Sequence, residues 1–112
     1  MEIYHNPRCA KSRQTLALLQ ENGVDPEIVL YLDSVPSPNE LKSLLLKLDL
    51  SPIQLVRKGE KIWKEQFKGK DLSDEEIIEA MIAHPKLIER PIVVKDQKAV
   101  LGRPPENVLD LL

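Results

Sequence analysis

The chain reads Ile3-Tyr4-His5-Asn6-Pro7-Arg8-Cys9-Ala10-Lys11-Ser12-Arg13 close to its N-terminus, and the expected architecture starts from this stretch. Residues 1–5 alternate weakly between apolar and polar and indicate a strand, after which Pro7 bends the chain into a loop. From Ala10 to about Asn22 the residues favour a helix, and Gly23 stands where a helix C-cap is expected. The helix therefore begins directly after Cys9.

The following segments complete a mixed sheet. Ile28-Val29-Leu30-Tyr31-Leu32 is a continuous apolar run, which predicts a second strand buried on both faces. A strand, a helix and a strand in the first 32 residues predict a βαβ unit with a parallel pair. Residues 91–94 and 99–101 flank a polar turn, as in a β-hairpin. Pro104 and Pro105 suit the start of a last helix whose apolar residues are Val108, Leu109 and Leu112.

Between these two parts, residues 38–84 predict a helical insertion. Ser37-Pro38-Asn39-Glu40 is typical of a helix start with a capping box. An amphipathic stripe follows, formed by Leu41, Leu44, Leu45 and Leu48. A second capping box at residues 73–76 starts another helix, which His84-Pro85 ends. We therefore expect an α/β fold with a four-stranded mixed sheet in the order βαβ, helical insertion, ββα.

Composition narrows the class of protein. With 112 residues, 42% of them hydrophobic and 30% charged, we expect a single globular domain over residues 1–112. Sixteen basic and eighteen acidic side chains give a net charge of −2, which argues against a nucleic-acid partner. No apolar run approaches the length of a membrane span and the N-terminus lacks an apolar signal region. We expect a cytoplasmic monomer with no membrane partner and, with one cysteine and two histidines far apart, no metal site.

The one cysteine, Cys9, is predicted to be reactive. A helix N-terminus presents free N–H groups and the positive end of the macrodipole, and both favour a thiolate. Arg8, Lys11 and Arg13 add positive charge to the same turn. An inert buried cysteine would lie among apolar neighbours, whereas residues 5–13 contain almost none. Cys9 is therefore interpreted as a nucleophile.

Two neighbouring positions restrict its chemistry. A tyrosine-phosphatase loop needs an arginine six residues after the cysteine, and this chain has Thr15 there. A dithiol redox motif needs a second cysteine at position 12, and this chain has Ser12. Cys9 cannot resolve a mixed disulfide within its own chain, so any covalent intermediate must be released by an external thiol.

Ser12 and His5 are candidate catalytic residues beside Cys9, each with an alternative. The Ser12 hydroxyl either hydrogen-bonds the thiolate one helical turn away or belongs to an ordinary first-turn serine. His5 either helps to deprotonate Cys9 or holds the loop through a hydrogen bond.

Three arginines are candidates for an anion pocket: Arg57, Arg90 and Arg103 each stand at an expected element boundary. Taken singly, each is a solvated surface residue. Together with Cys9 they would bind an oxyanion, because guanidinium groups bind oxyanions with two hydrogen bonds and lower the pKa of a nearby thiol. Pro91, just before an expected strand, is a candidate for a cis peptide bond.

The segment His5-Asn6-Pro7-Arg8-Cys9-x-x-Ser12-Arg13 resembles the active-site segment of the glutaredoxin-coupled arsenate reductases, which have a thioredoxin fold. The resemblance spans nearly the whole chain, because three further matches follow in the same order: Arg57, Glu89-Arg90-Pro91 and Leu101-Gly102-Arg103-Pro104. The chain also ends sooner after the last of these than the best-known plasmid-borne enzymes, and it carries Arg8, Ala10 and Lys11 where they have small or uncharged residues. These features resemble a chromosomal subgroup of the family.

The resemblance implies a thioredoxin-like fold and a role in arsenic detoxification. It implies that Cys9 attacks arsenate and forms a covalent thiol–arsenic adduct, that glutathione attacks next, and that glutaredoxin reduces the mixed disulfide while arsenite is released. No bound cofactor is implied, since glutathione and glutaredoxin act as reducing co-substrates. Pro91 would be the cis-proline of the fold and His5 would support ionisation of Cys9. The oxyanion and the adduct would be held by Arg57, Arg90 and Arg103.

Two other functions use the same residues. In a glutathione-dependent thiol transferase, Cys9 would attack a glutathione mixed disulfide and the arginines would bind glutathione carboxylates. In a redox partner protein without arsenate activity, Cys9 would titrate near the ordinary thiol pKa of about 8.5.

Overall fold

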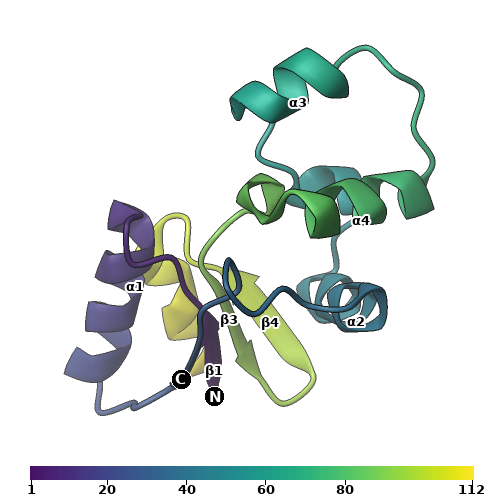
Figure 1. Ribbon diagram of the computed structural model, residues 1–112. Coiled ribbons are helices and arrows are strands. Elements are labelled where there is room, and N and C mark those ends of the chain that lie inside the picture. The colour runs from purple at the N-terminus through teal and green to yellow at the C-terminus, as the bar shows by residue number, and fades with distance from the viewer. The chain divides into compact units, whose positions relative to one another are not determined.

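The computed structural model describes residues 1–112, which divide into two compact units. The first unit comprises Met1–Ser34 with Arg90–Leu112 and contains the sheet, and the second comprises Val35–Glu89 and is helical (Figure 1). The helical insertion predicted around residues 38–84 is confirmed, whereas the single domain over residues 1–112 stays a prediction. None of the helices combines the length and the apolar character that crossing a membrane requires.

The first unit is built on four strands, which lie in the order β2-β1-β3-β4. They are β1 (Glu2–Tyr4), β2 (Glu27–Val29), β3 (Ile92–Lys95) and β4 (Lys98–Leu101). The central strand β1 pairs with β2 in parallel and with β3 antiparallel, so Ile3 lies opposite both Ile28 and Val93. Strands β3 and β4 form an antiparallel hairpin around Asp96, whose φ is 55°. The mixed four-stranded sheet of the predicted thioredoxin-like fold is thereby confirmed.

Strand β2 differs from its prediction. The expected strand over residues 28–32 was to be buried on both faces, but the observed strand is Glu27–Val29 and 47% of Ile28 is exposed. The physical reason is position, because β2 is an edge strand with β1 as its only neighbour in the sheet. The residues after Val29 form a turn in which Leu30 O accepts hydrogen bonds from Asp33 N and Ser34 N.

Helix α1 (Ala10–Glu21) begins directly after Cys9, as predicted. Gly23, with a φ of 80°, supplies the left-handed residue after its C-terminus. Gly23 N donates to Gln20 O at 3.0 Å and Val24 N donates to Leu19 O at 2.9 Å, the two bonds of a Schellman motif. This cap ends the helix where the glycine predicted.

Helix α1 and the C-terminal helix η3 (Pro105–Leu111) cover one face of the sheet (Figure 1). The core of the unit is one cluster of buried side chains: Ile3, Leu19, Val93, Val108 and Leu111. Helix η3 is a 3-10 helix, so residues three apart share a face. Val108 and Leu111 are therefore buried, whereas Leu109 and Leu112, which the sequence analysis named among the apolar residues of this helix, are 42% and 49% exposed.

The second unit contains three α-helices and two short 3-10 helices: α2 (Pro38–Leu48), η1 (Pro52–Leu55), α3 (Lys61–Gln66), α4 (Asp74–Ala83) and η2 (Pro85–Leu87). Ser37 caps α2 by accepting a hydrogen bond from Glu40 N at 3.2 Å. Ser73 and Glu76 form both bonds of the capping box that starts α4. The buried stripe of α2 packs against α4, which confirms this part of the pattern.

Candidate active site

Cys9 is the N-cap residue of α1 and has an extended backbone, with φ −93° and ψ 123°. Its N–H donates to Asn6 O at 3.0 Å, and its carbonyl accepts the first helical hydrogen bond, from Arg13 N at 3.0 Å. The side chain is half-buried. The thiol therefore lies where the free N–H groups of the first helical turn point toward it.

Two hydrogen bonds hold the loop before Cys9 against the first turn of α1, and a third closes the loop on itself. Asn6 N donates to Ser12 Oγ at 3.0 Å, and Arg13 Nη1 donates to Pro7 O at 2.9 Å. Within the loop, Asn6 Oδ1 accepts from Arg8 N at 3.0 Å. Asn6 is buried, and sequence reasoning did not single it out, although an asparagine before a proline is typical of side-chain-closed turns.

The surroundings of Cys9 favour the thiolate. Partial burial raises the pKa of Cys9 and is the largest single effect, but it is outweighed. The opposing effects, in order of size, come from the backbone N–H of Ser12, the side chain of Arg90 and the backbone N–H of Lys11. The pKa of Cys9 consequently lies below its ordinary value. In addition, Arg103 Nη1 lies 3.9 Å from Cys9 Sγ.

Two of the three predicted arginines, Arg90 and Arg103, thus come together at Cys9. They also contact each other, because Arg103 Nη1 donates to Arg90 O at 3.1 Å. Each arginine precedes a cis-proline, Pro91 and Pro104, and the second of these was not foreseen. The two guanidinium groups provide planar donors of the kind that bind oxyanions.

Gly102 determines how closely the segment with Arg103 approaches α1. Gly102 N donates to Pro91 O at 2.9 Å, and the Thr15 hydroxyl lies 3.3 Å from Gly102 O. A Cβ atom on Gly102 would lie 2.5 Å from Thr15 Oγ1 and 2.7 Å from Pro91 Cγ. Only a residue without a side chain fits here, so Gly102 is a positioning residue for Arg103.

His5 and Ser12 form a buried pair with a distance of 2.6 Å between His5 Nδ1 and Ser12 Oγ. Burial and then the charge of Arg13 lower the pKa of His5, so the imidazole is neutral at pH 7. The side chains of His5 and Ser12 bond to each other, and Ser12 Oγ also accepts from the Asn6 N–H, but neither side chain bonds to Cys9. This geometry corresponds to the loop-holding alternative for His5, while Ser12 reaches the thiolate through its backbone N–H.

Arg57 belongs to the second unit, where two half-buried carboxylates hold its guanidinium group. Arg57 Nη1 lies 3.2 Å from Glu89 Oε1, and Arg57 Nε lies 3.4 Å from Glu60 Oε1. Its backbone N–H donates to Leu87 O at 2.7 Å, next to the bridge between Val56 and Ile88. The role of Arg57 toward an oxyanion at Cys9 stays a prediction.

Comparison with known proteins relates this geometry to one family. The model of the ArsC family matches residues 4–111. A protein of Escherichia coli K12 named as uncharacterised (YfgD) is 51% identical over all of this chain and 96% of its own length. An arsenate reductase of Haemophilus influenzae is 47% identical over 98% of this chain and 97% of its own length. The structure of an arsenate reductase from Vibrio cholerae superimposes with a TM-score of 0.95 at 50% identity, covering 99% of this chain and 96% of that one.

Gly102→Ala should destabilise the protein by about 1–3 kcal/mol, because the added methyl group overlaps Thr15 and Pro91 in a packed interior. The free energy of unfolding in urea measures the effect. Gly59→Ala is the matched control, since a Cβ atom there has no neighbour within 4 Å. Equal unfolding free energies for Gly102→Ala and wild type would contradict the close approach.

The alkylation rate of Cys9 by iodoacetamide, measured against pH, should have its midpoint below the ordinary thiol value of about 8.5. Arg90→Gln should move the midpoint upward, because it removes a hydrogen bond and a positive charge that stabilise the thiolate. Lys98→Gln, which removes an exposed charge in β4, should leave the midpoint unchanged. A wild-type midpoint at or above 8.5 would rule out the stabilised thiolate.

Proposed function

Because the chain belongs to the ArsC family, we propose that it is an arsenate reductase in which Cys9 is the nucleophile. The observation that carries the proposal is the position of the one cysteine, which lies at the N-terminus of α1 and in contact with Arg103, in surroundings that lower the pKa of its thiol. Relatives named arsenate reductase, 40–47% identical over nearly the whole chain, support the choice of oxyanion.

In the first step the Cys9 thiolate attacks the arsenic atom of arsenate. A sulfur–arsenic bond forms and one arsenic–oxygen bond breaks, with the oxygen leaving as water after protonation. Arg90 and Arg103 neutralise the charge on the remaining oxygens, which lowers the barrier to attack by an anionic sulfur.

In the second step arsenic is reduced. The thiolate of glutathione attacks Cys9 Sγ, the sulfur–arsenic bond breaks, and its electron pair stays on arsenic, which leaves as arsenite. Cys9 and glutathione are then joined in a mixed disulfide. The two thiols together supply the two electrons that convert As(V) to As(III).

In the third step glutaredoxin regenerates the enzyme. A glutaredoxin thiolate attacks the glutathione sulfur of the mixed disulfide and Cys9 leaves as a thiolate. A low pKa makes Cys9 a good leaving group, so the surroundings that activate it in the first step also assist its release. With a single cysteine, the chain needs this external thiol.

We propose that the protein acts in the cytoplasm, where glutathione and glutaredoxin are available. It would act there as a monomeric enzyme in arsenic detoxification. Arg57 is proposed as a third arginine for the oxyanion. Its carboxylate partners Glu60 and Glu89 hold its guanidinium group in place in the second unit.

Cys9→Ser should abolish arsenate reduction in the presence of glutathione and glutaredoxin, because a serine hydroxyl is not ionised at neutral pH and cannot form the mixed disulfide. The rate of arsenite formation measures this. The wild-type protein is assayed in parallel with a glutathionylated peptide disulfide. Turnover of the disulfide without turnover of arsenate would favour the thiol transferase, and turnover by Cys9→Ser would refute the mechanism.

Arg90→Lys should raise the KM for arsenate roughly tenfold, because an ammonium group keeps the charge but loses the planar fork, at a cost of about 1.5 kcal/mol per charge-assisted hydrogen bond. Steady-state kinetics with varied arsenate and saturating glutathione measure it. The alkylation midpoint of Cys9 should change less than in Arg90→Gln, since the charge is retained. An unchanged KM would remove Arg90 from the oxyanion site.

A further inference from the structure

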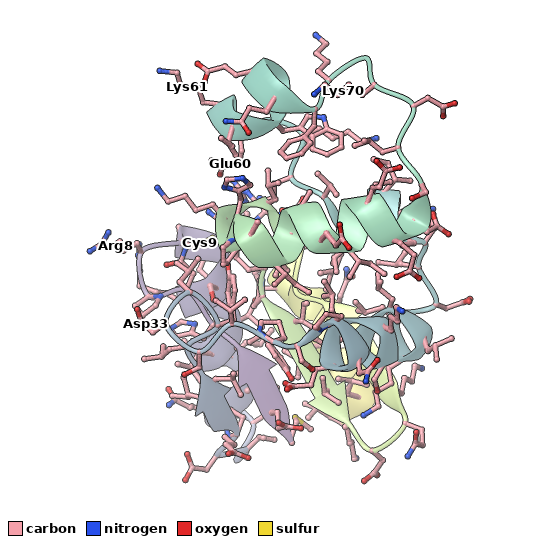
Figure 2. The ribbon with its side chains drawn as sticks, turned by 45° about the vertical axis from the view of Figure 1, so that its right-hand side comes forward. Arg8, Cys9, Asp33, Glu60, Lys61 and Lys70 are labelled. Carbon is pink, nitrogen blue, oxygen red and sulfur yellow. The ribbon has the colours of Figure 1, made fainter.

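A cavity of about 340 Å³ opens beside the loop that leads to Cys9. Its walls come from this loop and from the turn after β2, both in the first unit, and include His5, Asn6, Arg8, Leu30, Leu32 and Asp33. Figure 2 shows Arg8, Cys9 and Asp33 at the same edge of this unit. Cavities of this size lie at the lower end of small-molecule sites and suit a group the size of an amino acid.

The cavity carries one positive and one negative side chain that do not neutralise each other. Arg8 and Asp33 both line it, and neither forms an ion pair with the other or with any other residue. The one hydrogen bond of Arg8 to the loop uses its backbone N–H, so its guanidinium group keeps all five donors.

Two buried polar side chains that line the cavity, those of His5 and Asn6, also have atoms that make no hydrogen bond within the protein. His5 bonds to Ser12 through Nδ1, and Asn6 accepts from Arg8 N through Oδ1. His5 Nε2 and Asn6 Nδ2 have no partner within the protein, although both residues are more than nine-tenths buried. Such atoms are available to hydrogen-bond a ligand.

We propose that this cavity binds the α-amino-acid end of the reducing thiol, with Arg8 on its carboxylate and Asp33 on its ammonium group. The inference rests on the proposed function, in which glutathione attacks Cys9. The γ-glutamyl end of glutathione carries both charges on one carbon atom and matches the pair of opposite charges. Arg8 directly precedes Cys9, so their Cα atoms lie about 3.8 Å apart and a thiol peptide held by Arg8 has Cys9 within reach.

The cavity also differs from the proposed oxyanion site in its lining residues and in its charge. Arg90 and Arg103, which contact Cys9, do not line the cavity. Asp33 would repel arsenate but attract an ammonium group. The two reactants would therefore occupy different sides of the cysteine.

Binding is tested with S-methylglutathione, which cannot react, titrated calorimetrically into the full-length protein. Arg8→Gln and Asp33→Asn should each weaken binding about tenfold, which corresponds to the loss of one charge-assisted hydrogen bond. Lys98→Gln and Asp25→Asn remove the same charges from exposed positions of the first unit outside the cavity, and should bind as wild type does. Weakening by these controls to the same degree would overturn the proposal, as would unchanged binding in both cavity variants.

A second probe isolates the Asp33 contact. S-methyl-N-glutaryl-cysteinylglycine keeps the carboxylate of the γ-glutamyl group and lacks its ammonium group. Wild type should bind this analogue about tenfold more weakly than S-methylglutathione, and Asp33→Asn should cause no further weakening, whereas Arg8→Gln should. A full additional loss in Asp33→Asn would place Asp33 away from the ammonium group and overturn the assignment.

Failure of this proposal and of the proposed function give different results. If arsenate is reduced but the KM for glutathione is the same in wild type, Arg8→Gln and Asp33→Asn, the cavity proposal fails and the reductase stands. If S-methylglutathione binding depends on Arg8 and Asp33 but arsenate is not reduced, the cavity stands as a thiol-peptide site and the reductase fails.

Discussion

The hydrogen bonds that the backbone N–H groups of Lys11 and Ser12 provide to the Cys9 thiolate are the interaction on which the site depends. They exist only while Cys9 caps α1, and Cys9 caps α1 only while the preceding loop stays on the first helical turn. The contacts of Asn6 with Ser12 and of Pro7 with Arg13 keep it there. Burial raises the pKa of Cys9, so ionisation of the thiol depends on the loop holding Cys9 against these N–H groups of the first helical turn.

The second source of stabilisation for the Cys9 thiolate is a pair of arginines in the C-terminal part of the chain. Arg90 and Arg103 reach Cys9 because the sheet places β3 beside β1 and because Gly102 lets the segment after β4 approach α1 closely. A helix N-terminus alone would activate a thiol without selecting a substrate. The two guanidinium groups make the surroundings selective for an anion, and the same charges return Cys9 to its thiolate form after each turnover.

Much of this arrangement could be predicted from local patterns. The helix start at Cys9, the two serine-capped helices and the hairpin each have a signal within a few residues, and the structure confirms them. The errors have non-local causes. Whether the run at Ile28 is covered depends on its place at the sheet edge, and the buried face of η3 depends on its adopting three residues per turn. Likewise, the close contact between Thr15 and Gly102 joins residues 87 positions apart, and no spacing rule in the sequence indicates it.

The central claim is that Cys9 is a single thiolate whose oxyanion adduct is resolved by an external thiol. Intact-mass spectrometry of the wild-type protein, incubated with arsenate and glutathione but without glutaredoxin, tests it most directly. The account predicts that the protein gains the mass of one glutathione moiety, attached at Cys9, and that the gain requires arsenate. A protein that remains unmodified, or that gains the same mass without arsenate, would contradict it.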